Sequence, residues 1–365
     1  MRLIDEFRDS TLAREIAARI HREAVRPMQF MEICGTHTMA IARYGLKALL
    51  PETIRLISGP GCPVCVTPQA QIDAFIRLGT QPDVTLASFG DMLRVPGSTT
   101  TLETARAGGA DVRVVYAPLD AVELARQHPE RRVVFCGVGF ETTMPAVALA
   151  VTEAQRLGVA NFFLFCAHKV IPPALQMLAS DREIALDGFI CPGHVSAIIG
   201  SETYEPIARE HGIPCVVTGF EPLDILQAIW MLVRQVNRAE AKVEIQYTRA
   251  VSRQGNPAAM ACVERVFTPE DAEWRGLGVI PGSGMRLRET FAAHDATRFV
   301  PAAPDEVSTP SICECGRILT GRQRPADCQA FATACTPAHP LGPCMVSSEG
   351  ACAAEYRYVA RPSWP

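Results

Sequence analysis

The sequence lacks both long hydrophobic runs and a strong excess of charge of either sign. No apolar run reaches the ~18 residues that would indicate a membrane-spanning helix. Residues 1–8 contain four charged side chains, so a secretory signal peptide is not expected and we predict a cytoplasmic protein. The formal net charge is only −4, which provides no global field to attract nucleic acid or an anionic membrane. We therefore expect neither nucleic acid nor a membrane among its partners.

Low-complexity segments and short solenoid repeats are also absent from the sequence. The chain has 365 residues, of which 48% are hydrophobic, so it can bury more than one core and we expect two or three domains. Fourteen cysteines are present. In a chain of this size with no expected export signal, they are predicted to be reduced thiols, metal ligands or redox pairs.

Between Met28 and about Val236, short apolar runs alternate with helical patterns. This alternation is typical of an α/β fold with largely parallel sheets. We predict eight strands, at Met28–Cys34, Ile54–Ser58, Val84–Ser88, Val112–Tyr116, Arg132–Gly137, Asn161–Cys166, Gly188–Cys191 and Pro214–Thr218. Because such sheets bind ligands outside the carboxyl ends of their strands, the residues that follow these strands are the first candidates for a site.

The pattern changes after about Glu240. Val243–Val251 is predicted to form a further strand and Pro281–Gly284 a turn. A proline-rich stretch, Pro301–Pro310, then introduces a tail that carries six of the fourteen cysteines. We predict three domains, namely two α/β domains at residues 1–130 and 131–240 and a cysteine-rich domain at residues 241–365.

The strongest local signal is a Cys-x-x-Cys pair, Cys62 and Cys65, in the glycine- and proline-rich segment Gly59–Pro68. Thr67 is predicted to cap the helix that follows, with Pro68 at its first position. A helix N-terminus lowers the pKa of a nearby thiol, which favours redox or metal chemistry. The alternative is that both cysteines are only small apolar residues at a tight turn.

A second signal is Cys34, which follows the first predicted strand and precedes Gly35 and His37. This thiol is predicted to be either a nucleophile with His37 as its base or a soft ligand for low-spin ferrous iron, and a buried structural cysteine is the alternative. We expect Gly35 to leave space for a bulky centre. Four other cysteines lie in apolar runs and are predicted to be core residues: Cys136, Cys166, Cys215 and Cys262.

The tail contains four cysteines at spacings of 7, 9 and 8 residues, namely Cys328, Cys335, Cys344 and Cys352. Four thiolates can hold one four-iron four-sulfur (4Fe-4S) cluster, with one cysteine for each iron. A structural zinc site is the rival, although zinc usually draws on close Cys-x-x-Cys pairs and these four cysteines contain none. The surplus pair Cys313 and Cys315 leaves the assignment of ligands open.

The tripeptide Gly-Phe-Glu follows a predicted strand twice, at Gly139–Glu141 and Gly219–Glu221, which indicates either two related α/β halves or coincidence. The first copy lies in Gly137–Thr142, which is not a dinucleotide-binding fingerprint because a threonine replaces its third glycine. Glu141 and His194, each just after a predicted strand, are instead candidates to face the central site. A purely loop-forming role is the alternative for the His194 segment.

Five of these motifs occur in order along nearly the whole chain, at Met31–Thr38, Gly59–Pro68, Gly139–Thr143, Pro192–Ser196 and Gly342–Gly350. Together they resemble the HypD family of hydrogenase maturation proteins. The resemblance implies two Rossmann-like α/β domains and a C-terminal region that carries a 4Fe-4S cluster. It also implies a role in assembling the Fe(CN)2CO centre of nickel-iron hydrogenases, together with a small chaperone, HypC, and a cyanide donor, HypE.

The resemblance also implies roles for individual cysteines. Cys34 would bind the iron jointly with a cysteine of HypC, and Cys62 and Cys65 would act near the same iron as a redox pair or as ligands. The cluster would be held by Cys328, Cys335, Cys344 and Cys352. Releasing cyanide from a thiocyanate on a partner's cysteine requires electrons, so a dithiol pair and a cluster in one protein suit that chemistry.

Two other functions compete with an assembly scaffold. A stand-alone iron–sulfur or thiol oxidoreductase would convert a soluble substrate without partners. A zinc-stabilised binding protein would contain zinc and show no charge-transfer absorption in the visible range.

Overall fold

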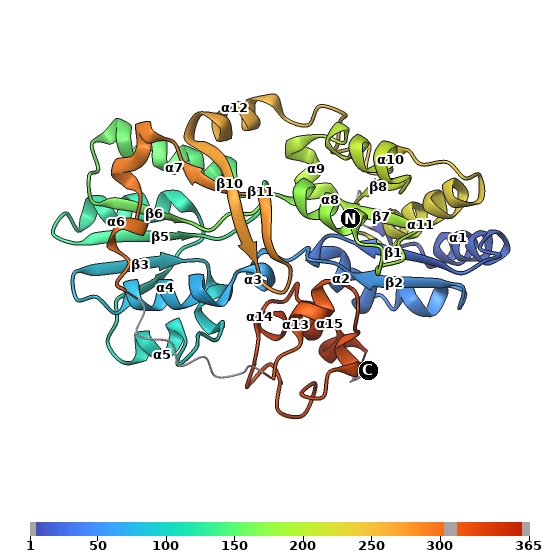
Figure 1. The fold of residues 1–365 in the computed structure, drawn as a ribbon, viewed down its shortest axis with the longest axis horizontal. Helices are drawn as coiled ribbons and strands as arrows, with labels where there is room; N and C mark the ends of the chain where they lie inside the picture. The colour runs from blue at the N-terminus through green and yellow to red at the C-terminus, as the bar shows by residue number, and fades with distance from the viewer. Residues whose placement is uncertain (1–4, 303–311, 360–365) are drawn as a thin grey trace.

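Two parallel sheets stand side by side, and a cysteine-rich tail lies below them (Figure 1). The computed structural model describes residues 5–302 and 312–359. The first sheet has the order β2 (Ile54–Ser58), β1 (Met28–Glu32), β7 (Gly188–Pro192), β8 (Cys215–Thr218) and β9 (Val243–Ile245). The second has the order β4 (Val112–Val114), β3 (Val84–Ser88), β5 (Arg132–Gly137) and β6 (Phe162–Cys166). The predicted α/β class with Rossmann-like parallel sheets is confirmed.

All eight predicted strands are present: three have the predicted bounds, four are a residue or two shorter and one is a residue longer. Two sequence predictions beyond Glu240 differ from the structure. The strand predicted at Val243–Val251 ends at Ile245, and the turn predicted at Pro281–Gly284 lies inside strand β11 (Gly278–Leu287). The strand is irregular at this point: the pairing shifts from Glu270 opposite Gly284 to Ala272 opposite Ile280, so the residues between form a bulge in which Gly282 has a φ of +63°.

The strands of each sheet come from both sides of residue 130, where we predicted a domain boundary. β3 and β4 pair with β5 and β6 from the following segment, and β1 pairs with β7, so that Phe30 lies opposite Gly188. The chain therefore begins the first sheet, builds the second and returns to complete the first. This route places the carboxyl ends of β1 and β2 next to elements from the middle of the chain.

Helices cover the outer faces of both sheets and connect their strands. Their bounds are α1 (Ser10–Glu23), α2 (Gly35–Arg43), α3 (Pro63–Val66), α4 (Gln69–Gly79), α5 (Leu102–Ala107), α6 (Pro118–Gln127), α7 (Met144–Leu157), α8 (Ile171–Ser180), α9 (Gly193–Ile199), α10 (Glu205–His211), α11 (Pro222–Asn237), α12 (Pro257–Val266), α13 (Cys315–Leu319), α14 (Pro343–Val346) and α15 (Ala351–Tyr358). The apolar face of α4, formed by Ile72, Phe75 and Ile76, is buried. Within the described residues, no helix combines the length and apolar character that a membrane crossing requires.

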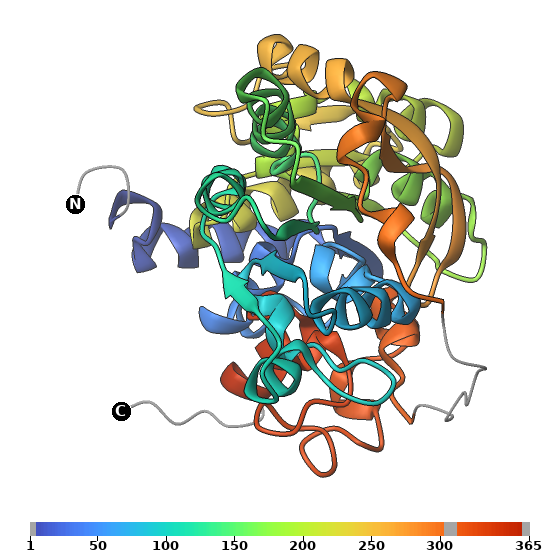
Figure 2. The same cartoon turned by 90° about the vertical axis from the view of Figure 1, so that its left-hand side faces the viewer.

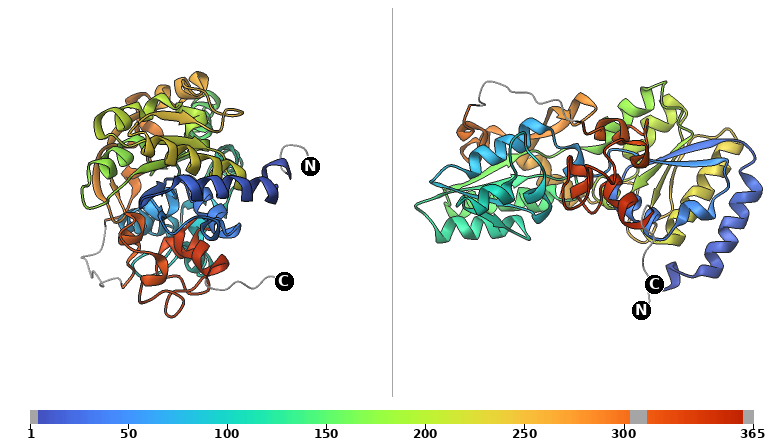
Figure 3. Two further views of the ribbon diagram at one scale, coloured as in Figure 1. Left: turned by 90° about the vertical axis from the view of Figure 1, so that its right-hand side faces the viewer. Right: turned by 90° about the horizontal axis from the view of Figure 1, so that it is seen from below.

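A long antiparallel hairpin, β10 (Phe267–Trp274) and β11, runs between the two halves of the molecule and down to the tail (Figure 1). At its tip, the backbone N–H of Arg275 donates to the Val66 carbonyl of α3 at 2.8 Å. Seen from below, the tail lies across the junction of the two halves (Figure 3). In the side view it lies at the opposite end of the molecule from α12 (Figure 2). Residues 303–310 of the predicted proline-rich stretch fall outside the described residues.

Candidate functional site

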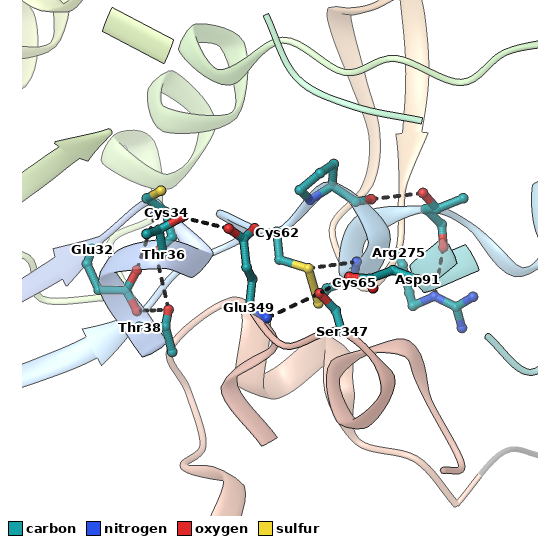
Figure 4. Close-up of a disulfide and its surroundings, with 12 residues drawn as sticks. Glu32, Cys34, Thr36, Thr38, Cys62, Cys65, Asp91, Arg275, Ser347 and Glu349 are labelled. Atoms are coloured by element: carbon teal, nitrogen blue, oxygen red, sulfur yellow. Dashed lines mark hydrogen bonds between the residues drawn. A yellow bond between two sulfur atoms is a disulfide. The ribbon is translucent and has the colours of Figure 1, made fainter. Parts of the chain in front are cut away.

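The loops that follow β1 and β2 touch each other, and this contact brings Cys34 to the Cys-x-x-Cys segment (Figure 4). The Gly35 N–H donates to the Gly61 carbonyl at 2.8 Å. A Cβ atom on Gly61 would lie only 2.2 Å from the Cys34 nitrogen, so only glycine fits here. Because β1 and β2 are parallel neighbours, their carboxyl ends meet at one edge of the sheet, as the sequence predicted.

Cys62 and Cys65 form a disulfide across the short helix α3, and both residues are buried. Cys62 occupies the N-cap position, where its sulfur accepts the Cys65 N–H at 3.2 Å. The predicted cap by Thr67 is wrong: its hydroxyl donates to the Pro63 carbonyl at 2.8 Å and ends α3. Pro68 lies one residue before α4. The cysteine pair therefore has its own helical turn, which the sequence did not indicate.

Cys34 is 8% exposed and caps α2 without a side-chain hydrogen bond to it. Burial, with the nearby Glu349 carboxylate, raises the pKa of the Cys34 thiol to about 12, while the backbone N–H groups of His37 and Thr36 oppose this rise. A thiol held in this way ionises when a cation replaces its proton. The environment therefore suits a metal ligand better than a free nucleophile.

Glu32 fixes the loop that carries Cys34. Its carboxylate accepts the Cys34 N–H at 3.2 Å and the hydroxyl proton of Thr38. Burial raises the pKa of Glu32 to about 7. We did not predict this residue, although a glutamate at the end of the apolar run Met28–Glu32 was a visible signal, because a strand buried on both faces rarely contains an unpaired charge.

The tail closes over the Cys34 loop from below. The Thr36 hydroxyl donates to Glu349 Oε1 at 2.6 Å. A Cβ atom on Gly35 would lie 2.4 Å from the Glu349 Cβ, so the space expected there for a bulky centre is filled by the tail. That expectation is wrong, because the small size of Gly35 allows Glu349 of the tail to pack against the start of α2. Sequence patterns do not reveal a contact between residues so far apart in the chain.

His37 does not act as a base toward Cys34 through its Nε2 atom, which is hydrogen-bonded to the Gly219 carbonyl at 2.9 Å. This bond assigns the proton to Nε2, and burial lowers the pKa of His37 to about 4, so the ring is neutral. The ring stacks on Phe220, with centroids 4.8 Å apart. His194 stacks on the same ring at 3.8 Å, so the second Gly-Phe-Glu copy joins two of the predicted site residues.

Glu141, in the loop after β5, accepts the Ile171 N–H at 2.8 Å and so holds the start of α8. Its other oxygen, Oε2, is buried without a hydrogen-bond partner among the described residues. Burial raises the pKa of Glu141 to about 7. Its role at the central site remains a prediction.

The tail cysteines gather in one cluster, which includes the pair that we had treated as surplus. Cys315 is hydrogen-bonded to both Cys313 and Cys344. The Leu341 N–H donates to Cys335 Sγ at 3.4 Å. The hydrogen bond with Cys315 and burial raise the pKa of Cys313. Burial and the neighbouring thiols likewise raise the pKa of Cys352; these neighbours are Cys313, Cys335, Cys315 and Cys328.

Within residues 5–302 and 312–359, no set of three or more His, Cys, Asp or Glu side chains is arranged to hold a metal ion. The chemistry of the tail donors nevertheless fits a sulfur-bound metal centre, because all six are thiols that lie near one another. The assignment of a 4Fe-4S cluster to four of them stays a prediction.

Comparison with known proteins adds a family. The family model HypD, described as "Hydrogenase formation hypA family", matches residues 11–359. The chain is 51% identical to the hydrogenase maturation factor HypD of Azotobacter vinelandii, over 98% of this chain and 97% of that protein. Identity to the factor of the same name is 49% in Cupriavidus necator, over 98% of this chain and 97% of that one. In Escherichia coli it is 45%, over 98% of each.

Proposed function

The chain belongs to the HypD family of hydrogenase maturation factors, and from this premise we propose that it is the scaffold on which the Fe(CN)2CO centre of nickel-iron hydrogenases is assembled. The iron in this proposal is cargo. It would be held by Cys34 of this chain and by a cysteine of a small chaperone of the HypC kind. A partner of the HypE kind would supply cyanide.

The observation that carries this proposal is that the Cys34 loop, the disulfide loop and the tail come together at the carboxyl ends of β1 and β2. The Cys34 loop lies against the loop of Cys62 and Cys65 through Gly61, and the tail reaches the Cys34 loop through Glu349. A single-cysteine ligand beside a disulfide is a suitable arrangement for binding a soft metal next to a two-electron thiol couple.

The residues of the chain can be given definite tasks. Cys34 would release its proton when iron binds, since a thiolate is the ligand form. Glu32 and Thr38 would hold the loop still, and the Phe220 ring with its two stacked histidines would exclude water from one side. The cluster, which supplies one-electron redox chemistry when bound, would be held by Cys328, Cys335, Cys344 and Cys352.

The test is anaerobic co-purification of the chain with a chaperone of the HypC kind, followed by infrared spectroscopy. We expect bands of iron-bound cyanide and carbon monoxide in the wild-type complex. Cys34→Ser should lose them, because a hydroxyl is a hard and weakly acidic ligand. As a matched control, Cys136→Ser changes a buried thiol of the second sheet and should keep the bands. Bands of wild-type intensity in Cys34→Ser would move the iron elsewhere.

The disulfide favours a second candidate, a stand-alone thiol oxidoreductase. Such an enzyme would turn over a soluble disulfide without a partner, and its rate would depend on Cys62 and Cys65 but not on Cys34. Turnover assays of the isolated chain and of its Cys34→Ser variant separate the two functions. A scaffold is expected to be inactive alone.

A further inference from the structure

Arg275, at the tip of the β10–β11 hairpin, lies between the disulfide helix and the tail thiols. It occupies the three-residue turn between Trp274 and Gly278, away from either sheet. Nothing in the sequence motifs pointed to it.

Three hydrogen bonds anchor Arg275 to the segment that follows the disulfide. Its backbone N–H donates to the Val66 carbonyl at 2.8 Å, and its Nε donates to the Thr67 carbonyl at 2.8 Å. Its Nη1 donates to Gln69 Oε1 at 3.1 Å. The guanidinium is therefore fixed in orientation by the end of α3 and the start of α4.

On its other side the hairpin tip meets the first cysteines of the tail. Gly276, next to Arg275, has a φ of +79°, and a Cβ atom there would lie 2.2 Å from the Cα of Gly316. Gly316 is the neighbour of Cys315, in helix α13. The hairpin tip thus lies between the disulfide helix, beside which Figure 4 shows Arg275, and helix α13 of the tail.

The charge of Arg275 has no carboxylate partner among the salt bridges of the described residues. Its Nη2 atom is buried and has no hydrogen-bond partner there. A charged group of this kind is normally paired when it is shielded from water. The residue after Arg275 packs on Gly316, the neighbour of Cys315, so the tail thiols are the groups that the tip of the hairpin faces.

We infer that Arg275 is a positioning residue that holds the disulfide helix against the tail and serves as the counter-charge of the tail thiolates. A divalent metal bound by four thiolates carries a net charge of −2, so a fixed cation beside it favours binding. The inference rests on the proposed cooperation of the two sulfur groups. Because the inference concerns the tail thiolates and any metal that they bind, it would still hold if no iron centre were assembled at Cys34.

The test uses cobalt(II) as the probe, in a reduced full-length chain in which Cys62 and Cys65 are serine, so that thiolate-to-cobalt absorption reports the tail. In this background we expect Arg275→Gln and Arg275→Met to bind cobalt about tenfold more weakly, or about 1.4 kcal/mol. Arg275→Lys keeps the charge and should stay within threefold.

The control is Arg288→Gln at the opposite end of the hairpin. Arg288 makes the same kinds of contact, from its backbone N–H to the Val266 carbonyl at 2.9 Å and from its Nε to the Glu264 carbonyl at 2.7 Å. It should bind cobalt like the parent chain. The inference fails if both uncharged variants bind within twofold of the parent, if Arg275→Lys is as weak as they are, or if Arg288→Gln is weakened equally.

Discussion

At the scale of single residues, glycine is what allows the parts of the site to touch. Gly61 admits the Cys34 backbone and Gly35 admits Glu349, and neither contact leaves room for a Cβ atom. Because these glycines have no side chain, neighbouring segments of the chain can pack directly against their backbone.

The first prediction concerns Gly35→Ala. Its new Cβ would lie 2.4 Å from the Glu349 Cβ and 2.6 Å from the Glu349 carbonyl oxygen, so the tail must move away from α2. We expect a loss of stability of about 1–3 kcal/mol, typical of overpacking, and faster amide hydrogen exchange in α15. Gly90→Ala is the control, because its Cβ would meet nothing closer than 3.8 Å. Unchanged exchange in Gly35→Ala would contradict the contact.

A second prediction at this scale concerns Glu141 and pH. Burial raises the pKa of this carboxyl from 4.5 to about 7, so the folded state holds a proton that the unfolded state has lost between these values. Stability from this group is thus full below pH ~4.5 and declines as pH rises to about 7, by roughly 3 kcal/mol in total.

Glu141→Gln should therefore unfold at the same temperature as wild type at pH 4.5 and at a higher temperature at pH 8. The amide oxygen can still accept the Ile171 N–H. Glu103→Gln, at an exposed position, serves as the control and should follow the wild type at both pH values. Equal melting temperatures of Glu141→Gln and wild type at pH 8 would show that the carboxylate is better solvated than the structure implies.

At the scale of elements, the short helix α3 makes two cysteines into a pair. Its single turn places Cys65 N–H on the sulfur of Cys62 and the two sulfurs in bonding contact. By contrast, Cys191 and Cys215 are hydrogen-bonded thiols on the neighbouring strands β7 and β8 and remain free. Cys191 lies opposite Val217 and Cys215 opposite Phe189, so these two thiols are offset diagonally across the strands and are not held on one helical turn.

The third prediction follows from that contrast. In the reduced chain, glutathione disulfide should close Cys62–Cys65 within minutes, and two glutathione thiols should reopen it, giving two protein thiols and one glutathione disulfide. The pair on β7 and β8 should stay reduced in the same samples. Alkylation after denaturation, followed by peptide mass spectrometry, reports both pairs. Oxidation of the two pairs at equal rates would show that helix α3 does not favour formation of the Cys62–Cys65 disulfide.

At the scale of the whole molecule, the positions of most strands could be predicted from the sequence, but the way in which they are divided between two sheets could not. The strands of the two parallel sheets were visible as apolar runs, because strands covered by helices need a hydrophobic sequence, whereas β10 and β11 were not predicted. The convergence of Cys34 with Cys62 and Cys65 followed from the shared edge of parallel strands. Sheet membership was hidden, because pairing β1 with β7 depends on which apolar faces pack together, not on local pattern.

The same limit explains what was missed in the site. The roles of Glu32, Arg275 and Glu349 arise from contacts with Cys34, α3 and α2, and no spacing rule links such residues to their partners. Cys313 and Cys315 seemed surplus because spacing was judged along the chain. In space they lie with Cys344, so six thiols are available where four would hold a cluster.

The last prediction concerns the expected 4Fe-4S cluster and its effect on the tail and the Cys34 loop. We expect anaerobically reconstituted chain to bind one 4Fe-4S cluster, measured as iron and sulfide content and visible absorption. Cys344→Ala should abolish it, because Cys344 is one of the four expected ligands and lies in α14 beside α3. Cys315→Ala should have a milder effect if the four spaced cysteines are the ligands.

Because metal binding is coupled to folding, loss of the cluster in Cys344→Ala should also loosen the tail and, through Glu349, the Cys34 loop. Amide hydrogen exchange in α15 and at the start of α2 should therefore rise together in this variant. Cys262→Ala, a partly buried thiol of α12 at the other end of the molecule, should change neither the iron content nor the exchange. Zinc at full occupancy without iron in an anaerobic preparation would refute the cluster. Faster exchange in α15 without a change in α2 would show that the Glu349 contact does not couple the tail to the Cys34 loop.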